Sequence, residues 1–218
     1  MENKKYSFII FDMDGLLVDT EKAYYEGWLD AFEKNGLDIP SSVVRGWAGK
    51  SIEYTWNYLK DYTDDVGKIR ADREAYVYRQ LETGNLPAKP FAREVLETLK
   101  ARGFTIGLAT SSIQKRATDI LSALGLFSYI DYPVFASDVA RAKPYPDVYL
   151  EVMRRAEAAS ETSLVVEDSL TGAEAAKNAG ISVVLVPDGS FSHKEEKIPE
   201  NVVAQGCDLR KVLEFLLG

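Results

Sequence analysis

The chain has 218 residues, of which 46% are hydrophobic and 28% charged, a balance that is ordinary for a soluble globular protein. Its formal net charge of −8 argues against a general binding surface for nucleic acid or for an anionic membrane. No apolar segment approaches the length needed to cross a bilayer. The single cysteine, Cys207, excludes an internal disulfide. Because residues 1–5 are polar and lead directly into an apolar run, we expect no signal peptide and a cytoplasmic location.

The first element is the apolar run from Phe8 to Phe11, which leads into Asp12, Met13, Asp14 and Gly15. Such a run predicts a strand buried on both faces of a parallel sheet, and ligands of these sheets bind at the carboxyl ends of the strands. Two adjacent carboxylates repel each other unless a cation lies between them, so Asp12 and Asp14 predict a hard cation such as Mg²⁺. The alternative is a turn that is simply rich in aspartate.

Residues 18–85 contain helical patterns at 21–35, 51–62 and 65–83 and no convincing strand. We therefore expect an all-helical cap domain over residues 18–85, inserted into a core formed by residues 1–17 and 86–218. All three tryptophans, Trp28, Trp47 and Trp56, lie in the insert, which predicts that it has a small core of its own. Two linkers at one end of the sheet, at 15–19 and 84–90, would allow the insert to act as a lid.

From residue 90 onward, apolar stretches alternate with amphipathic helical patterns. This alternation predicts βα units on a parallel sheet. The predicted fold class is therefore α/β, with a Rossmann-like parallel-sheet core and an inserted all-helical cap. The four strands expected in this part of the chain lie at 104–110, 133–137, 163–167 and 181–186.

Each of the next three strands also leads to polar or charged residues. Thr110, Ser111 and Ser112 precede a helix, where hydroxyls and backbone amides can hold a phosphate oxygen, although Ser112 alone is equally typical of a helix N-cap. Lys143 is followed by two prolines, Pro144 and Pro146, which hold it at a defined place beside a helix start. The fourth strand ends in a second acidic pair, Glu167 and Asp168. Helix capping could explain Asp168, but it does not explain why four strand ends all carry such groups.

These four segments resemble, in order, the motifs of the haloacid dehalogenase-like superfamily of phosphotransferases. The matching segments are Asp12-Met-Asp14-Gly15 with Asp19-Thr20, then Thr110-Ser111-Ser112, then Lys143-Pro-Tyr-Pro-Asp147, and finally Val166-Glu167-Asp168-Ser169-Leu-Thr-Gly172. The resemblance spans essentially the whole chain. The insert between the first two motifs is similar to the helical cap of the subfamily that contains β-phosphoglucomutase and many small-molecule phosphatases.

The resemblance implies that Asp12 is the nucleophile, forming an aspartyl phosphate, and that Asp14 is the general acid and then the general base. It implies that Ser111 hydrogen-bonds the phosphoryl group and that Lys143 neutralises its oxygens. Mg²⁺ would be held by Asp12, by the backbone carbonyl of Asp14 and by Asp168. Glu167 would be a direct or water-mediated further ligand.

Asp14 argues against dehalogenases and phosphonatases, which, as the resemblance implies, lack the second aspartate. Two other positions argue against a mutase, because Tyr24 and Ile52 stand where β-phosphoglucomutase has a histidine and an arginine. The only histidine, His193, lies in a late loop. We therefore expect a phosphatase of a small phosphorylated metabolite, with sugar phosphates as the favoured class. The alternatives are a β-phosphoglucomutase-like phosphohexomutase and, less favoured, a non-catalytic binding module.

In the expected cap, Lys50 is a candidate for binding a distal anionic group of the substrate, although a solvent-exposed lysine after a glycine is an equal alternative. Glu21 and Tyr24 are candidates for lining the substrate cavity. The sequence leaves the oligomeric state open and is compatible with a monomer.

Overall fold

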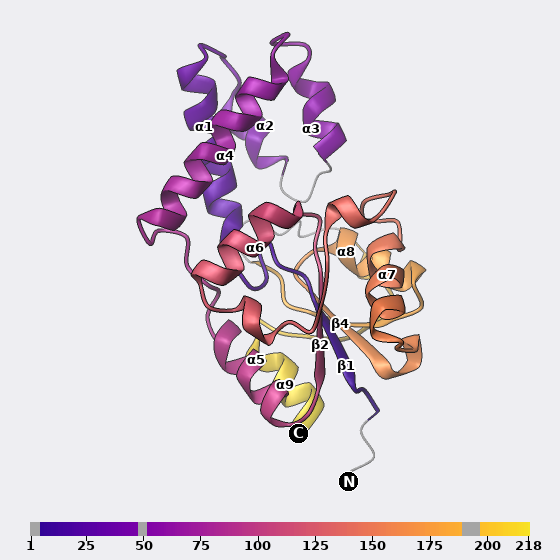
Figure 1. The fold of residues 1–218 in the computed structure, drawn as a ribbon. Coiled ribbons are helices and arrows are strands. Elements are labelled where there is room, and N and C mark those ends of the chain that lie inside the picture. Colours follow the sequence, from indigo (N-terminus) through magenta and orange to yellow (C-terminus); the bar gives the residue numbers. More distant parts are fainter. Residues whose placement is uncertain (1–4, 48–51, 189–196) are drawn as a thin grey trace. The chain divides into compact units, whose positions relative to one another are not determined.

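The structure is a computed structural model that describes residues 5–47, 52–188 and 197–218. The chain divides into two compact units (Figure 1). The core unit comprises Met1–Val18 and Ala88–Gly218, and the inserted unit comprises Asp19–Pro87.

The core unit is built on a parallel sheet with the strand order β3-β2-β1-β4-β5-β6. The strands are β1 (Phe8–Phe11), β2 (Thr105–Ala109), β3 (Tyr132–Val134), β4 (Ser163–Glu167), β5 (Ser182–Leu185) and β6 (Val202–Gln205). β1 lies between β2 and β4, where Phe11 is in register with Leu108 and with Val166. The residues that follow β1, β2 and β4 therefore meet at one edge of the sheet. Among the strands of the described residues, β1 and β4 are buried along their whole length, as their apolar runs predict.

Helices cover the sheet on both faces (Figure 1). They are α5 (Ala92–Ala101), α6 (Gln114–Ala123), α7 (Asp147–Ala156), α8 (Leu170–Asn178) and α9 (Arg210–Leu217). On one face, Val152 of α7 and Ala176 of α8 pack with Phe8 and Ile10 of β1 in a buried apolar cluster. Because this cluster rests directly on β1, it fixes the strand that delivers Asp12.

The inserted unit contains α1 (Thr20–Lys34), α2 (Ser41–Arg45), α3 (Ile52–Leu59) and α4 (Val66–Glu82), and its described residues include no strand. An aromatic cluster forms its core, in which the ring of Trp28 lies 5.8 Å from that of Phe32 and 5.2 Å from that of Trp47. The insert therefore has a core of its own, as expected, but Trp56 is not part of this cluster. It is 37% exposed, and the guanidinium of Arg70 lies over its ring.

Several elements differ from the sequence-based expectation. The strand expected at 133–137 ends at Val134, because Asp138 accepts a hydrogen bond from the Phe135 amide and closes the short helical turn Ala136–Asp138. β6, α2 and α9 were not predicted. β6 is only half buried and its side chains alternate between partly buried and exposed, so it lacks a continuous apolar run.

The segments that leave and rejoin the sheet run side by side within the core unit. The amide of Lys89, in the returning segment, donates to the carbonyl of Leu17, in the outgoing one, at 2.9 Å. An antiparallel bridge joins Val18 to Ala88. None of the described helices has the length and apolarity required to span a membrane.

Candidate active site

Asp12 is presented at the carboxyl end of β1. Its amide donates to the carbonyl of Val166, which continues the pairing of β1 with β4. Its carboxylate is buried and accepts a hydrogen bond from Lys143 at 2.6 Å. Burial raises the pKa of Asp12 to about 7, with the negative charges of Glu167 and Asp14 acting in the same direction and Lys143 opposing them. A further positive charge near this buried carboxylate would lower its pKa and favour its ionised form.

Lys143 lies between two carboxylates. Its ammonium is 2.6 Å from Asp12 Oδ1 and 2.5 Å from Glu167 Oε1, and its side chain is only 7% exposed. Burial alone would lower the pKa of Lys143, but the charges of Asp12 and Glu167 outweigh it and hold that pKa well above its usual value. Lys143 is therefore a fixed positive charge at the end of β1.

Protein donors hold both oxygens of the fully buried Glu167 carboxylate. Oε1 accepts from the Tyr149 hydroxyl at 2.8 Å as well as from Lys143. Oε2 accepts from the amides of Asp168 and Ser169 and from the Ser169 hydroxyl, at 3.0–3.2 Å. Burial alone would raise the pKa of Glu167, but Lys143 and these donors lower it. Glu167 therefore anchors Lys143 to the start of α8.

Two residues to which the sequence analysis assigned no role complete this arrangement. Tyr149, from α7, also places its ring 4.9 Å from the Lys143 ammonium. Gly172, in α8, makes room for Glu167, because a Cβ atom placed on Gly172 would lie 1.8 Å from Glu167 Oε1. The sequence carried a signal for Gly172, which ends the fourth motif, whereas Tyr149 lies two residues beyond the end of the third motif.

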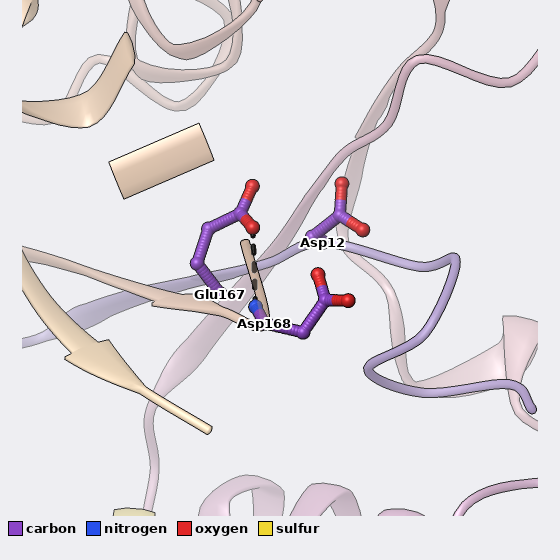
Figure 2. A group of neighbouring side chains, drawn as sticks. All are labelled: Asp12, Glu167 and Asp168. Carbon is purple, nitrogen blue, oxygen red and sulfur yellow. Dashed lines mark hydrogen bonds between the residues drawn. The ribbon is translucent and has the colours of Figure 1, made fainter. Parts of the chain in front are cut away.

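Three carboxylates gather at this edge of the sheet, those of Asp12, Glu167 and Asp168 (Figure 2). One oxygen atom from each of them lies within 4.8 Å of the other two. Asp12 and Asp168 turn their carboxylates to the same side, whereas Glu167 turns back toward the Asp168 amide (Figure 2). Gly15 lies against Asp168 with φ +80, and a Cβ atom there would be 2.2 Å from Asp168 Oδ2. Clustered carboxylate oxygens are what a hard divalent cation prefers, so the residues present fit such an ion.

Asp14 lies beside the residues that follow β2. Its Oδ2 accepts hydrogen bonds from the hydroxyls of Ser112 and Thr110, the latter at 3.4 Å. Ser112 is not a helix N-cap, because α6 begins after Ile113 and the Ser112 hydroxyl is engaged by Asp14 and Arg116. Thr110 is buried and accepts the Ser112 amide at 3.0 Å, whereas Ser111 is exposed, and its contact to a phosphoryl group stays a prediction.

The structure tests the remaining candidates only in part. Lys50 and His193 lie outside the described residues, as does the side chain of Ile52. Glu21 occupies the first turn of α1, and Tyr24, also in α1, packs its ring against the guanidinium of Arg73 at 5.0 Å. Their contacts to a substrate stay predictions.

A doubly wound parallel sheet with acidic groups and a buried lysine at its carboxyl edge defines an α/β enzyme of the Rossmann-like class. Residues 9–186 match the family of haloacid dehalogenase-like hydrolases. The chain belongs to this family, as the four motifs predict.

Relatives with established names agree with this assignment. The chain is 35% identical over 179 residues to the "Phosphorylated carbohydrates phosphatase" of Thermotoga maritima, an alignment that covers 79% of this chain and 81% of that protein. It is 30% identical over 214 residues to "(DL)-glycerol-3-phosphatase 1, mitochondrial" of Arabidopsis thaliana, covering 93% of this chain and 71% of the relative. The crystal structure of CbbY from Rhodobacter sphaeroides in complex with phosphate has the same fold, with a TM-score of 0.85, 22% identity, and coverage of 97% of this chain and 99% of that one.

Proposed function

We propose that this hydrolase is a Mg²⁺-dependent phosphatase that acts on a small phosphorylated carbohydrate through an aspartyl phosphate on Asp12. One observation carries the proposal, namely that a buried ammonium is fixed 2.6 Å from the Asp12 carboxylate at the edge where the other acidic groups gather. The name of the Thermotoga maritima relative supports the substrate class.

In the first step, an oxygen of Asp12 forms a bond to phosphorus while the ester bond to the leaving oxygen breaks. Asp14 gives its proton to the leaving oxygen, so that the product is an alcohol. In the second step, the oxygen of water forms a bond to the phosphorus while the bond between phosphorus and Asp12 breaks, and the water gives a proton to Asp14. Inorganic phosphate leaves, and both aspartates return to their starting states.

A carboxylate that approaches a phosphate dianion is repelled, so positive charge is needed at the site. Lys143 supplies one such charge, and Glu167 and Tyr149 hold it in place. Asp12, Asp168 and the backbone carbonyl of Asp14 would hold Mg²⁺, whose contribution is to neutralise phosphoryl oxygens. Glu167 would serve such an ion through water, because its oxygens already accept hydrogen bonds from protein donors.

The test is phosphate release from a panel of sugar phosphates, nucleotides and small phosphoesters, with and without Mg²⁺. Asp12→Asn is compared with the parent, and circular dichroism verifies that the variant folds. We expect Mg²⁺-dependent release that is highest for a sugar phosphate and is abolished by Asp12→Asn.

Two other outcomes would replace the proposal. Efficient interconversion of hexose 1-phosphate and 6-phosphate that depends on a bisphosphate activator would indicate a phosphohexomutase. No phosphoryl transfer in either assay would indicate a non-catalytic binding module.

A further inference from the structure

A hydrogen-bonded chain of side chains runs from Arg116 to Asp14. Arg116 Nη2 donates to Ser112 Oγ at 2.8 Å, and Ser112 Oγ donates to Asp14 Oδ2. Ser112 is completely buried and Arg116 is only 9% exposed. None of the four sequence motifs includes Arg116, and the mechanism above does not use it.

The location of Arg116 is unfavourable for a cation. Arginine is rarely buried, and Arg116 is the third residue of α6, close to the helix end where the backbone dipole repels positive charge. On the same helix, Lys115 is exposed to solvent and pairs with Asp119. Arg116 is thus buried where arginine is uncommon, and its hydrogen bond to Ser112 brings its charge close to Asp14.

The direction of the hydrogen bonds follows from the chemistry of the groups. A guanidinium has donors only, so Ser112 Oγ must accept from Arg116. The single proton of the Ser112 hydroxyl is then left to point at Asp14 Oδ2. A serine without Arg116 could rotate its hydroxyl away, whereas the bound guanidinium removes that freedom.

We propose that Arg116 is a positioning residue that acts through Ser112 to keep Oδ2 of Asp14 a hydrogen-bond acceptor. The proton that Asp14 exchanges is then carried on Oδ1. In the first step this proton moves from Oδ1 to the leaving oxygen, and in the second step Oδ1 receives a proton from water. Arg116 and Ser112 transfer no proton themselves. The inference rests on the proposed phosphatase function.

The test compares two substrates that differ in their need for an acid. The best sugar phosphate of the panel has a poor leaving group that must be protonated, whereas the p-nitrophenolate of p-nitrophenyl phosphate departs without a proton. The parameter measured is kcat/KM, because it reports only the steps up to the departure of the leaving group. The variants are Arg116→Met, Ser112→Ala, their combination, and Lys115→Met as a control that removes a neighbouring exposed cation.

For Arg116→Met we expect kcat/KM on the sugar phosphate to fall about 10- to 100-fold, part of the roughly 10²- to 10⁴-fold contribution of a general acid. On p-nitrophenyl phosphate we expect a fall of less than about threefold. The double variant should be no worse than Ser112→Ala alone, because the two residues act in series. Arg116→Lys, which retains a donor, should recover part of the loss, and Lys115→Met should match the parent.

Equal losses on the two substrates, or additive losses in the double variant, would overturn the inference and leave Arg116 a purely structural role. If Arg116→Met does not fold, Ser112→Ala and Arg116→Lys apply the same substrate comparison. If the parent hydrolyses both substrates and each variant loses the same fraction of its activity on the two, only this inference is refuted. A parent that hydrolyses neither refutes the proposed function, and the inference with it.

Discussion

Replacing Gly172 by alanine tests whether Glu167 is held as tightly as the structure indicates. A Cβ atom at this position would lie 1.8, 2.4 and 2.0 Å from Oε1, Oε2 and Cδ of Glu167. Because all three atoms of the carboxylate group would lie closer than 2.5 Å to the added Cβ atom, a small rotation of the group cannot relieve the clash. The whole group must move and abandon its contacts to Lys143 and Tyr149.

The expected loss can be worked from these contacts. Breaking a buried ion pair so that one charge is left uncompensated costs about 3–5 kcal/mol. Alanine is favoured over glycine in a helix by up to about 1 kcal/mol, which offsets part of this loss. We therefore expect Gly172→Ala to lower the free energy of unfolding by about 2–4 kcal/mol.

Urea unfolding of the metal-free protein measures this difference, with Gly67→Ala as the matched control. Gly67 lies in the first turn of α4, and a Cβ atom there would meet no atom closer than Asp65 Oδ1 at 3.6 Å. The control should be neutral or slightly stabilising. A Gly172→Ala protein within about 1 kcal/mol of the parent would show that Glu167 can be rearranged at little cost, which contradicts the reasoning about the anchor.

Three further predictions concern the metal site and the surface. Gly15→Ala strains a backbone with φ +80 and displaces Asp168. It should therefore weaken Mg²⁺ binding at least about tenfold, a loss of about 1.4 kcal/mol, as measured by isothermal titration calorimetry. Unchanged affinity would argue against Asp168 as a ligand. Adding Mg²⁺ at about 100 times its Kd should stabilise the parent by about 2.7 kcal/mol in thermal unfolding, and an equal gain in Asp12→Asn would exclude Asp12 from the site. Two arginines lower the pKa of Glu151 from 4.5 to about 2, so its stabilisation is present above pH 4.5 and is lost as the pH falls toward 2. Glu151→Gln should therefore lower the free energy of unfolding by no more than about 1 kcal/mol at pH 7, since solvent screens these ion pairs, and by less at pH 3. Urea unfolding at the two pH values measures this, and a loss that does not shrink at pH 3 would contradict this account.

The sequence predicted the strands that bring the site together because these strands are continuous apolar runs. β1, β2 and β4 are buried along nearly their whole length, and a strand of this kind has few polar positions to obscure its pattern. β6 lies at the edge of the sheet and is half exposed, so its four residues carry too weak a signal. The polar residues that follow β1, β2 and β4 could be expected to lie close together, since the carboxyl ends of parallel strands lie at the same edge of the sheet.

Side-chain partners within the site were harder to predict. Ser112 precedes a helix, which favours an N-cap, but its hydroxyl turns to Asp14 because a tertiary contact supplies a charged acceptor. Arg116 lies four residues after Ser112, but Ser112 precedes α6, so the spacing of residues on a helix face does not predict their contact. Nor does the sequence show that Ser112 also reaches Asp14, which follows β1.

The central place of β1 has a consequence for how the enzyme is made. Phe8 pairs with Thr105 and with Ser163, so the strand that leads to Asp12, the proposed nucleophile, is synthesised before both of its neighbours and must wait for them. At about 5–20 residues per second, this wait lasts on the order of 10–30 s. During that interval an apolar strand is exposed to chaperones and to other nascent chains. The site around Asp12 therefore cannot form until β4 has been synthesised, and a chain that stops before β4 leaves this apolar strand exposed.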